Sequence, residues 1–327
     1  MAFPDKHDGG TLLGCARPCS AGGAAGAPRG LTQKDCGYRV AAGFLLPDQG
    51  GREKRQRRSG HLGILLLRSS WHTARQSAAW AGKLRQMKGL KTQLLGSTPP
   101  SSPLDAQLSA SIDTFLAERP PGADEDVHMV SAIADHIIER CSAPGDLVFD
   151  PFAGFGTTLG RAVARGRQAL GIELLPERAD YLQERIPGAR VIEGDARELL
   201  RLVLGMEPPG AVTGVDLIVA SPPYMTSTFH EPDPLTAYEE NNGDYGRYLS
   251  ELGLVAAQCA SLVKPGGYVV WNLSDIHHMG RTTHLISDCA HVLAQHLTPV
   301  GITEIVWDEY PHDLIADALL VFQRPPA

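Results

Sequence analysis

Two short stretches of the chain, Asp150-Pro-Phe-Ala-Gly-Phe-Gly-Thr-Thr158 and Ser221-Pro-Pro-Tyr224, indicate its fold. Each follows a run of apolar, strand-forming residues, at 146–150 and 215–220 respectively. The first stretch opens into a helical pattern, so it is predicted to be a strand, a glycine-rich turn and the start of a helix. In an α/β sheet, ligands bind where the carboxyl ends of parallel strands meet. We therefore expect the two stretches to place a ligand and a reacting group side by side.

Composition limits the class of protein. The chain has 327 residues, 43% of them hydrophobic, which is enough for one large α/β domain with an appendage. Its apolar stretches, such as Ile64-Leu-Leu-Leu67, are too short to span a bilayer, and no secretory signal pattern opens the sequence. The 6 cysteines are scattered, so reduced thiols are expected rather than a disulfide framework or a metal site. We expect a cytoplasmic protein that has no membrane partner.

Charge divides the chain into two parts. Residues 1–100 hold 16 of the 30 lysines and arginines but 5 of the 37 acidic residues, so the remainder holds 14 against 32. The basic part is rich in Gly, Ala, Arg and Pro, and only residues 71–92 have a helical pattern. We predict that residues 1–103 form a largely disordered extension and that residues 104–327 form the catalytic domain. The extension is either a nucleic-acid-binding arm or an unstructured segment without that role.

Helix and strand patterns alternate from about Leu104. Apolar residues recur at helical spacing from Val130 to Ile138. Strands are predicted at 147–150, 168–173, 190–193, 215–220, 267–273, about 302–308 and 316–323, and helices at 157–165, 176–185, 247–263 and 283–297. This alternation predicts a doubly wound, mostly parallel sheet of seven strands. Only residues 309–313 separate the last two runs, which is too short for a crossover helix, so the final strand is predicted to be antiparallel.

Two glycines and two carboxylates indicate a cofactor site. Gly154 and Gly156 let the backbone approach a ligand, and the helix that follows offers free N–H groups. Glu173 ends the next predicted strand, where such folds bind ribose hydroxyls. Asp195 follows the third strand, where a carboxylate can accept a hydrogen bond from an adenine amino group. A dinucleotide is the alternative cofactor, but it leaves Ser221-Pro-Pro-Tyr224 unexplained.

Together, the two stretches resemble the S-adenosylmethionine-dependent amino-methyltransferases of the cytosine-N4/adenine-N6 DNA methylase family. The resemblance covers residues from about 125 to 325 and implies a Rossmann-like class I methyltransferase fold with S-adenosylmethionine as cofactor. His128 stands where the family often has His-Pro-x-x-Lys-Pro, although the Lys-Pro is absent, and it is a candidate contact to the methionine moiety. The residues that match the family's cofactor turn are Asp150, Phe152, Gly154 and Gly156.

Ser221-Pro-Pro-Tyr224 suits methyl transfer to an exocyclic amino group of a base. The lone pair of such an amine is delocalised into the ring, and hydrogen bonds from its N–H groups to fixed oxygens make it available. Ser221 offers a side-chain oxygen, and Pro222 offers a carbonyl whose backbone is restricted by the rings of Pro222 and Pro223. Tyr224 offers an aromatic face for a base taken out of a helix. In the family, Asp at the first position is usual for adenine, and Ser is seen most among cytosine-N4 enzymes.

The resemblance leaves the substrate open. DNA is expected, but tRNA guanine-N2 methyltransferases share the fold and a similar Pro-Pro-Tyr turn, and a non-catalytic S-adenosylmethionine-binding protein is a third interpretation. DNA methylases of this motif order need a target-recognition segment, and no insertion beyond about 25 residues is evident here. The polar stretch at 225–248 is expected to fold over the base. Asn272, Ser274 and Asp275 end a predicted strand at the same edge.

Overall fold

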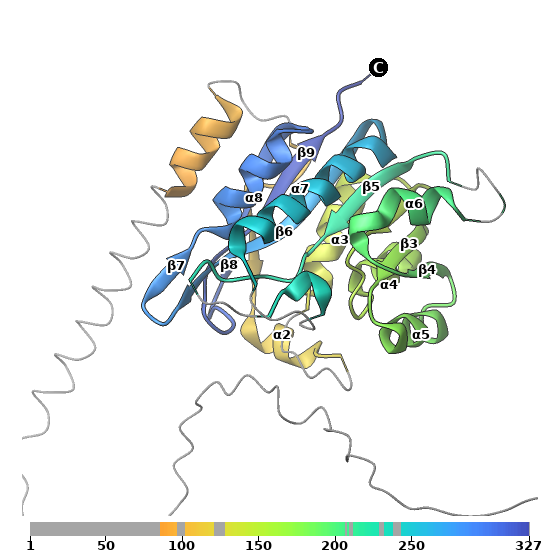
Figure 1. Ribbon diagram of the computed structural model, residues 1–327, viewed down its shortest axis with the longest axis horizontal. Helices are drawn as coiled ribbons and strands as arrows, with labels where there is room; N and C mark the ends of the chain where they lie inside the picture. Colours follow the sequence, from red (N-terminus) through yellow and green to blue (C-terminus); the bar gives the residue numbers. More distant parts are fainter. Residues whose placement is uncertain are drawn as a thin grey trace, which may run out of the picture. The chain divides into compact units, whose positions relative to one another are not determined.

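The computed structural model describes residues 86–96, 102–120, 128–206, 208, 212–228, 232–237 and 243–326 (Figure 1). The strands are β1 (Gln107–Ala110), β2 (Leu147–Asp150), β3 (Gln168–Glu173), β4 (Ala189–Glu193), β5 (Val215–Ala220), β6 (Val263–His278), β7 (Arg281–Thr283), β8 (Thr298–Trp307) and β9 (Leu314–Gln323). The helices are α2 (Ile112–Ala117), α3 (Ser131–Cys141), α4 (Thr157–Ala164), α5 (Pro176–Arg185), α6 (Leu199–Leu204), α7 (Tyr245–Leu262) and α8 (Leu285–Ala294). Two 3-10 turns, η1 (Ala196–Glu198) and η2 (Pro234–Thr236), and a helix over residues 86–95 complete the described elements.

The sheet has the order β1-β8-β9-β6-β5-β2-β3-β4, and β7 pairs with β6. Strands β2 to β6 run parallel, whereas β9 is antiparallel to both β6 and β8. The predicted doubly wound, mostly parallel sheet with an antiparallel C-terminal strand is thus confirmed. The sheet has nine strands rather than the seven predicted, because β1 and β7 join it. Both are short, at four and three residues, and neither carries the apolar run that marks the other strands.

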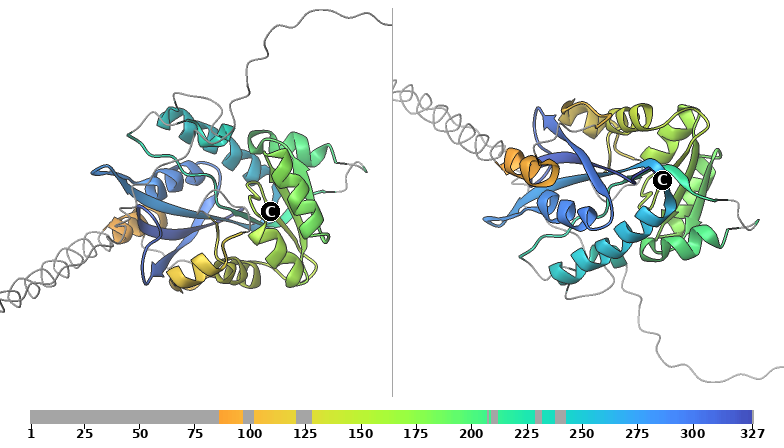
Figure 2. Two further views of the ribbon diagram at one scale, coloured as in Figure 1. Left: turned by 90° about the horizontal axis from the view of Figure 1, so that it is seen from below. Right: turned by 90° about the horizontal axis from the view of Figure 1, so that it is seen from above.

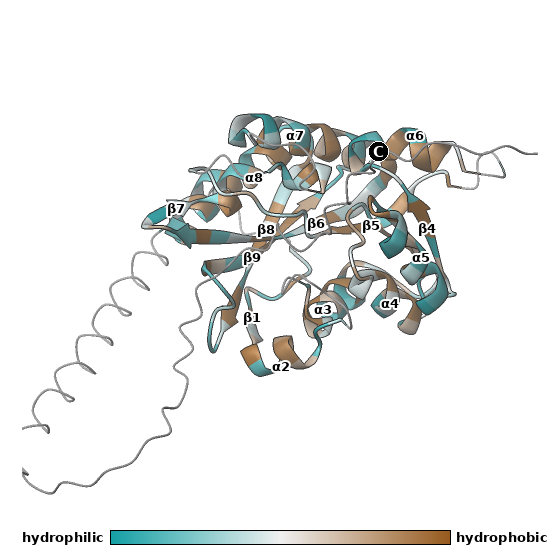
Figure 3. Cartoon of the chain, turned by 60° about the horizontal axis from the view of Figure 1, so that its bottom comes forward, coloured by the Kyte–Doolittle hydropathy of each residue, from teal (hydrophilic) through white to brown (hydrophobic). Residues whose placement is uncertain are grey.

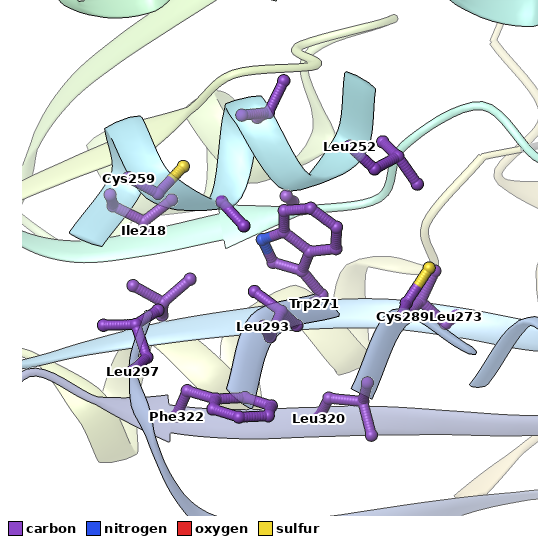
Figure 4. Close-up of a cluster of buried hydrophobic side chains, with 14 of the residues drawn as sticks. Ile218, Leu252, Cys259, Trp271, Leu273, Cys289, Leu293, Leu297, Leu320 and Phe322 are labelled. Atoms are coloured by element: carbon purple, nitrogen blue, oxygen red, sulfur yellow. The ribbon is translucent and has the colours of Figure 1, made fainter. Parts of the chain in front are cut away.

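Buried side chains form two clusters, one on each face of the sheet, and helices cover both faces (Figure 2). Successive residues of a strand point to opposite faces. Val148 therefore belongs to the cluster under α3 and α4, whereas Phe149 belongs to the cluster under α7 and α8. Trp271 is fully buried in the second cluster, where Leu252 and Cys259 of α7 surround it together with other apolar side chains (Figure 4).

The described cysteines are free thiols inside these clusters. Cys141 ends α3, Cys259 lies in α7 and Cys289 lies in α8. Burial raises the pKa of the Cys141 thiol to about 12 and also raises the pKa of Cys259 and Cys289. Reduced thiols were expected at these positions, and positions 15, 19 and 36 lie outside the described residues. None of the described helices combines the length and the apolar character that crossing a bilayer requires.

The helix over residues 86–95 lies within the stretch that the sequence assigns to the N-terminal extension. Its residues Met87 and Leu90 are buried in the cluster under α7 and α8. The side-chain amide of Gln86 also donates a hydrogen bond to the Asp275 carboxylate, at 3.2 Å. Apolar residues three positions apart share one face of a helix, which accounts for this packing. The folded unit therefore includes the end of the predicted extension, and residues 1–85 lie outside the described part.

Replacing Leu90 with Ala should destabilise the whole domain. Deletion of a buried leucine side chain removes apolar burial and leaves a cavity, so we expect the free energy of unfolding to fall by about 2–3 kcal/mol. Lys88→Ala, an exposed position of the same helix, is the matched control and should change it by less than about 0.5 kcal/mol. Urea unfolding followed by circular dichroism measures both. Equal midpoints for the two variants would show that the helix does not contribute to the fold.

Candidate functional site

In the turn after β2, backbone amides donate hydrogen bonds to two buried carboxylates. Asp150 is 4% exposed, and its carboxylate accepts a hydrogen bond from the Phe152 amide at 2.9 Å. Glu173, at the end of β3, accepts from the Gly154 amide at 2.8 Å and from the Leu175 amide at 3.1 Å. The Glu173 carboxylate thus fixes the glycine turn against the neighbouring strand end. Two of the predicted cofactor carboxylates therefore lie at one place on the carboxyl edge.

The two glycines of this turn serve different purposes. Both have left-handed backbones, with φ of 53° at Gly154 and 83° at Gly156. A Cβ at Gly154 would meet only the Phe152 carbonyl oxygen, at 3.8 Å. A Cβ at Gly156 would collide with the side chains of Leu182 and Ile186, with the Ile186 Cδ1 at 2.7 Å. The space beside Gly154 is open, and its role in ligand binding stays a prediction. At Gly156, the side chains of α5 and of the residue that follows it supply a packing reason for glycine.

Burial makes the carboxylates of the turn receptive to positive charge. Removal from water raises the pKa of Asp150 to about 7, and the neighbouring Glu173 carboxylate raises it further, while the Phe152 amide and the Thr158 hydroxyl oppose the shift. Burial also raises the pKa of Glu173. A cation beside such groups stabilises their ionised forms. The pair therefore favours a cationic ligand over the anionic diphosphate of a dinucleotide.

Asp195 caps the 3-10 turn that follows β4. Its carboxylate accepts from the Arg197 backbone amide at 2.8 Å and forms an ion pair with the Arg197 guanidinium, at 2.6 Å. The guanidinium also binds Glu251 of α7, at 2.9 Å. The Arg197 Nε also donates to both oxygens of Asp195, at 3.0 Å and 2.9 Å, so Arg197 contacts both oxygens of this carboxylate. The structure adds Arg197, which the sequence did not single out, as the group that orients this carboxylate.

Ser221-Pro-Pro-Tyr224 leaves β5 at the same edge, beside the cofactor turn. The register of β2 and β5, with Phe149 opposite Ile218, places these two strand ends next to each other. The Tyr248 hydroxyl of α7 donates a hydrogen bond to the Pro223 carbonyl at 2.8 Å. The structure thus brings together the predicted cofactor and reacting segments.

The Tyr224 hydroxyl is the centre of a buried group of hydroxyls. It donates to the backbone carbonyl of Asn272 in β6, at 3.2 Å. Burial is the main cause that raises the pKa of the Tyr224 phenol, so the hydroxyl keeps its proton. The hydroxyls of Ser221 and Ser274 lie beside it and lower the pKa of the phenol. Tyr224 as a whole is half-buried and packs against the core cluster under α7 and α8.

Asp317, in the middle of β9, anchors this group and was not identified from the sequence. It is 4% exposed and accepts hydrogen bonds from the Asn272 amide at 2.7 Å, from the Ser274 hydroxyl at 3.1 Å and from the Trp307 indole at 2.8 Å. Burial raises its pKa, and these three donors oppose the rise. A single aspartate inside the apolar run 314–323 was the available signal. The Asn272 side chain, expected to line the site, is instead used inside the sheet.

His128 is linked to the Asp317 cluster through two aromatic residues, Phe115 and Trp307. Its ring stacks on Phe115 of α2, with centroids 4.4 Å apart and an angle of 8°. Phe115 in turn meets Trp307 edge to face, at 5.9 Å. Because Trp307 donates to Asp317, His128 is connected to the cluster under Tyr224. A contact between His128 and a ligand remains a prediction.

A family model described as DNA methylase matches residues 128–184. No curated protein sequence matches the chain. Among solved structures, a TehB-like S-adenosylmethionine-dependent methyltransferase from Corynebacterium glutamicum is similar at 17% identity and a TM-score of 0.37, over 58% of this chain and 86% of that one. TrmN from Thermus thermophilus is similar at 19% identity and a TM-score of 0.38, over 60% and 49%.

The matched residues contain the turn after β2, Gly154, Gly156 and Glu173. The strand order and this turn define the chain as a class I methyltransferase that uses S-adenosylmethionine. The match to the DNA methylase model is confined to this part of the fold, residues 128–184.

Replacing Asp150 with Asn should change how stability depends on pH. The pKa of Asp150 in the folded protein is about 7, whereas in the unfolded chain the carboxyl has its ordinary pKa of 3.8. Folding therefore binds a proton between these values, and this residue's contribution to stability falls as pH rises through the window. Asn has no proton to release and can still accept from the Phe152 amide. When thermal midpoints are measured from about pH 4 to 8, the midpoint of the variant should rise relative to that of the wild type as pH increases. A difference that is constant with pH would contradict the assignment.

Gly156→Ala should destabilise the fold more than Gly154→Ala. Both substitutions place a side chain at positive φ, but only the first forces α5 to move, which typically costs about 1–3 kcal/mol. Gly154→Ala is the matched control for backbone strain, and it should weaken S-adenosylmethionine binding without a comparable loss of stability. Urea unfolding and titration calorimetry separate the two effects. If both variants lose equal stability, the packing explanation for Gly156 is wrong.

Proposed function

We propose that this protein methylates an exocyclic amino group of a base in DNA, either cytosine N4 or adenine N6. The family supports a DNA substrate. The main structural support for this chemistry is the group of hydroxyls around Tyr224. These neighbours would orient the Ser221 hydroxyl so that its oxygen can accept a hydrogen bond.

The turn after β2 provides the groups that would hold the cofactor. Gly154 leaves open space beside it, and the buried carboxylates of Asp150 and Glu173 favour a cation. S-adenosylmethionine fits this set because it carries a sulfonium and an ammonium group, and when bound it supplies an electrophilic methyl group. Glu173 would accept from the ribose hydroxyls and Asp195 from the adenine amino group. The residues proposed to line the cofactor site are Asp150, Phe152, Gly154, Gly156, Glu173, Asp195 and His128.

Ser221 is oriented as a hydrogen-bond acceptor. A hydroxyl has one proton, and the Tyr224 hydroxyl gives its proton to the Asn272 carbonyl. The Ser274 hydroxyl gives its proton to the Asp317 carboxylate, which can only accept. In a hydrogen bond between Ser221 and Tyr224, whose hydroxyls lie side by side, Ser221 would therefore be the donor. The lone pairs of the Ser221 oxygen are then left for an N–H group of the substrate.

The remaining residues of the segment position the base. The Tyr248 hydroxyl donates a hydrogen bond to the Pro223 carbonyl. Among the described residues, no hydrogen bond to the Pro222 carbonyl is found. Ser221 and Pro222 would accept the two N–H groups of the amine and draw its nitrogen toward tetrahedral geometry. Tyr224, which is half-buried, would offer its ring as a stacking surface, and stacking is worth about 1–3 kcal/mol per base. Rate acceleration then comes from alignment and from preorganised polar groups.

Transfer of a labelled methyl group tests the function directly. The full-length protein is incubated with S-adenosylmethionine carrying a labelled methyl group and with either duplex DNA or tRNA, and the nucleic acid is then digested to nucleosides. Labelled N4-methylcytosine or N6-methyladenine from DNA is the expected result. Labelled N2-methylguanine from tRNA, or no labelled nucleoside from either, would overturn the proposal.

Ser221→Ala should lower kcat by about 10²–10³, the usual loss when a transition-state hydrogen-bond partner is removed. Substrate affinity should change little, because the contact strengthens as the nitrogen becomes nucleophilic. Tyr224→Ala should instead raise KM through loss of the stacking surface. Tyr224→Phe should keep the affinity but lower kcat, since Ser221 then loses the group that orients its proton. Ser250→Ala, an exposed serine of α7, is the control. Wild-type rates in the Ser221 and Tyr224 variants would refute these roles.

A further inference from the structure

The β6–β7 hairpin extends beyond the edge of the sheet at which the proposed site lies. Ile276 pairs with Thr283 and His278 with Arg281, so only two residues form its turn. Within the described sheet, β7 pairs with β6 alone. The hairpin is largely hydrophilic in Figure 3 and stands apart from the other strands there and in Figure 1.

Met279 occupies the tip of the hairpin in an unfavourable conformation. Met279 and Gly280 both have left-handed backbones, with φ of 47° and 77°, as a two-residue hairpin turn of type I′ demands. Glycine adopts this conformation freely, whereas the Cβ of methionine opposes it. Met279 is also 73% exposed, more than any other large hydrophobic residue in the described part of the chain. Strain and exposure at one apolar side chain point to a function for that side chain.

The residues beside Met279 are suited to a polyanion. His277 and Arg281 are exposed on either side of the tip, and residues 276–284 contain one arginine, three histidines and no carboxylate. His278 lies against Asp313, which is outside the hairpin. By contrast, the chain as a whole has a formal charge of −7. The hairpin therefore presents an apolar tip beside one arginine and two histidines, on a chain whose net charge is negative.

Two contacts fix the hairpin relative to the base-binding segment. The Thr283 hydroxyl accepts a hydrogen bond from the Ser227 amide at 2.9 Å, only three residues after Tyr224. Ser274, whose hydroxyl lies beside that of Tyr224, is in β6 itself, five residues before Met279. At a rise of about 3.3 Å per residue, the tip is about 16 Å from Ser274. The hairpin thus stands beside the place where a base would enter.

We propose that Met279 is a wedge that enters the base stack of duplex DNA when the target base leaves it, with Arg281 on a neighbouring phosphate. Enzymes that act on a base extrude it from the duplex, which leaves a gap. Methionine is among the apolar side chains that proteins insert between base steps. The inference rests on the proposed function and supplies the target-engaging element for which the sequence shows no long insertion.

The test compares a duplex that carries the identified target base correctly paired with the same duplex in which that base is mispaired. A mispaired base leaves the stack more easily. Met279→Ala should therefore slow methylation of the paired duplex by about tenfold, and of the mispaired duplex much less. Met279→Leu should retain most of the activity. Arg281→Ala should weaken binding to both duplexes and reduce the slope of log affinity against log salt by about one.

Two controls separate this role from a structural one. Met279→Gly relieves the left-handed strain, so its thermal midpoint should not fall, yet it should lose activity on the paired duplex as the Ala variant does. Leu204→Ala removes an apolar side chain of α6 that is 60% exposed and should change neither rate. Equal slowing on both duplexes, or none, by Met279→Ala would overturn the wedge while leaving the proposed function intact. Absence of transfer to any DNA by the wild type would overturn both.

Discussion

Parallel pairing of β2 with β5 is the constraint on which the rest of the site depends. The strand order reverses between these two strands, so β3 and β4 lie on one side and β6 on the other. The helix after β2 packs into the cluster that contains Val148, and the helix that follows β5 packs into the cluster that contains Phe149. The two turns therefore share one edge while their helices leave to opposite faces. A cofactor turn and a reacting segment 71 residues apart (221 − 150) become neighbours for this reason.

Beneath that edge, a buried carboxylate gives direction to a set of hydroxyls. Asp317 can only accept, so each hydroxyl and amide around it must present a proton inward. Tyr224 donates to the backbone carbonyl of Asn272, whose side chain Asp317 holds, and Ser221 lies beside the Tyr224 hydroxyl. In the function proposed above, these neighbours orient a neutral serine as a hydrogen-bond acceptor.

The sequence predicts those parts of the molecule that depend on local chemistry. The glycine turn, Ser221-Pro-Pro-Tyr224 and the reversed last strand were evident because turn residues and short connections act over a few positions. The role of Asp317 was not evident from the sequence, because the groups that donate hydrogen bonds to it come from two other strands. The packing reason at Gly156 depends likewise on the side chains of Leu182 and Ile186. Burial of the helix over residues 86–95 was missed because its basic surroundings obscure the spacing of two apolar residues.

The three described cysteines are internal probes of local unfolding. Cys141 is buried on one face of the sheet, and Cys259 and Cys289 are buried on the other. Their raised thiol pKa keeps them unreactive toward alkylating reagents while they are covered. The rate at which each becomes alkylated therefore reports how often its own layer opens. Peptide mapping after alkylation would thus show whether the two layers of the protein come apart together or one at a time.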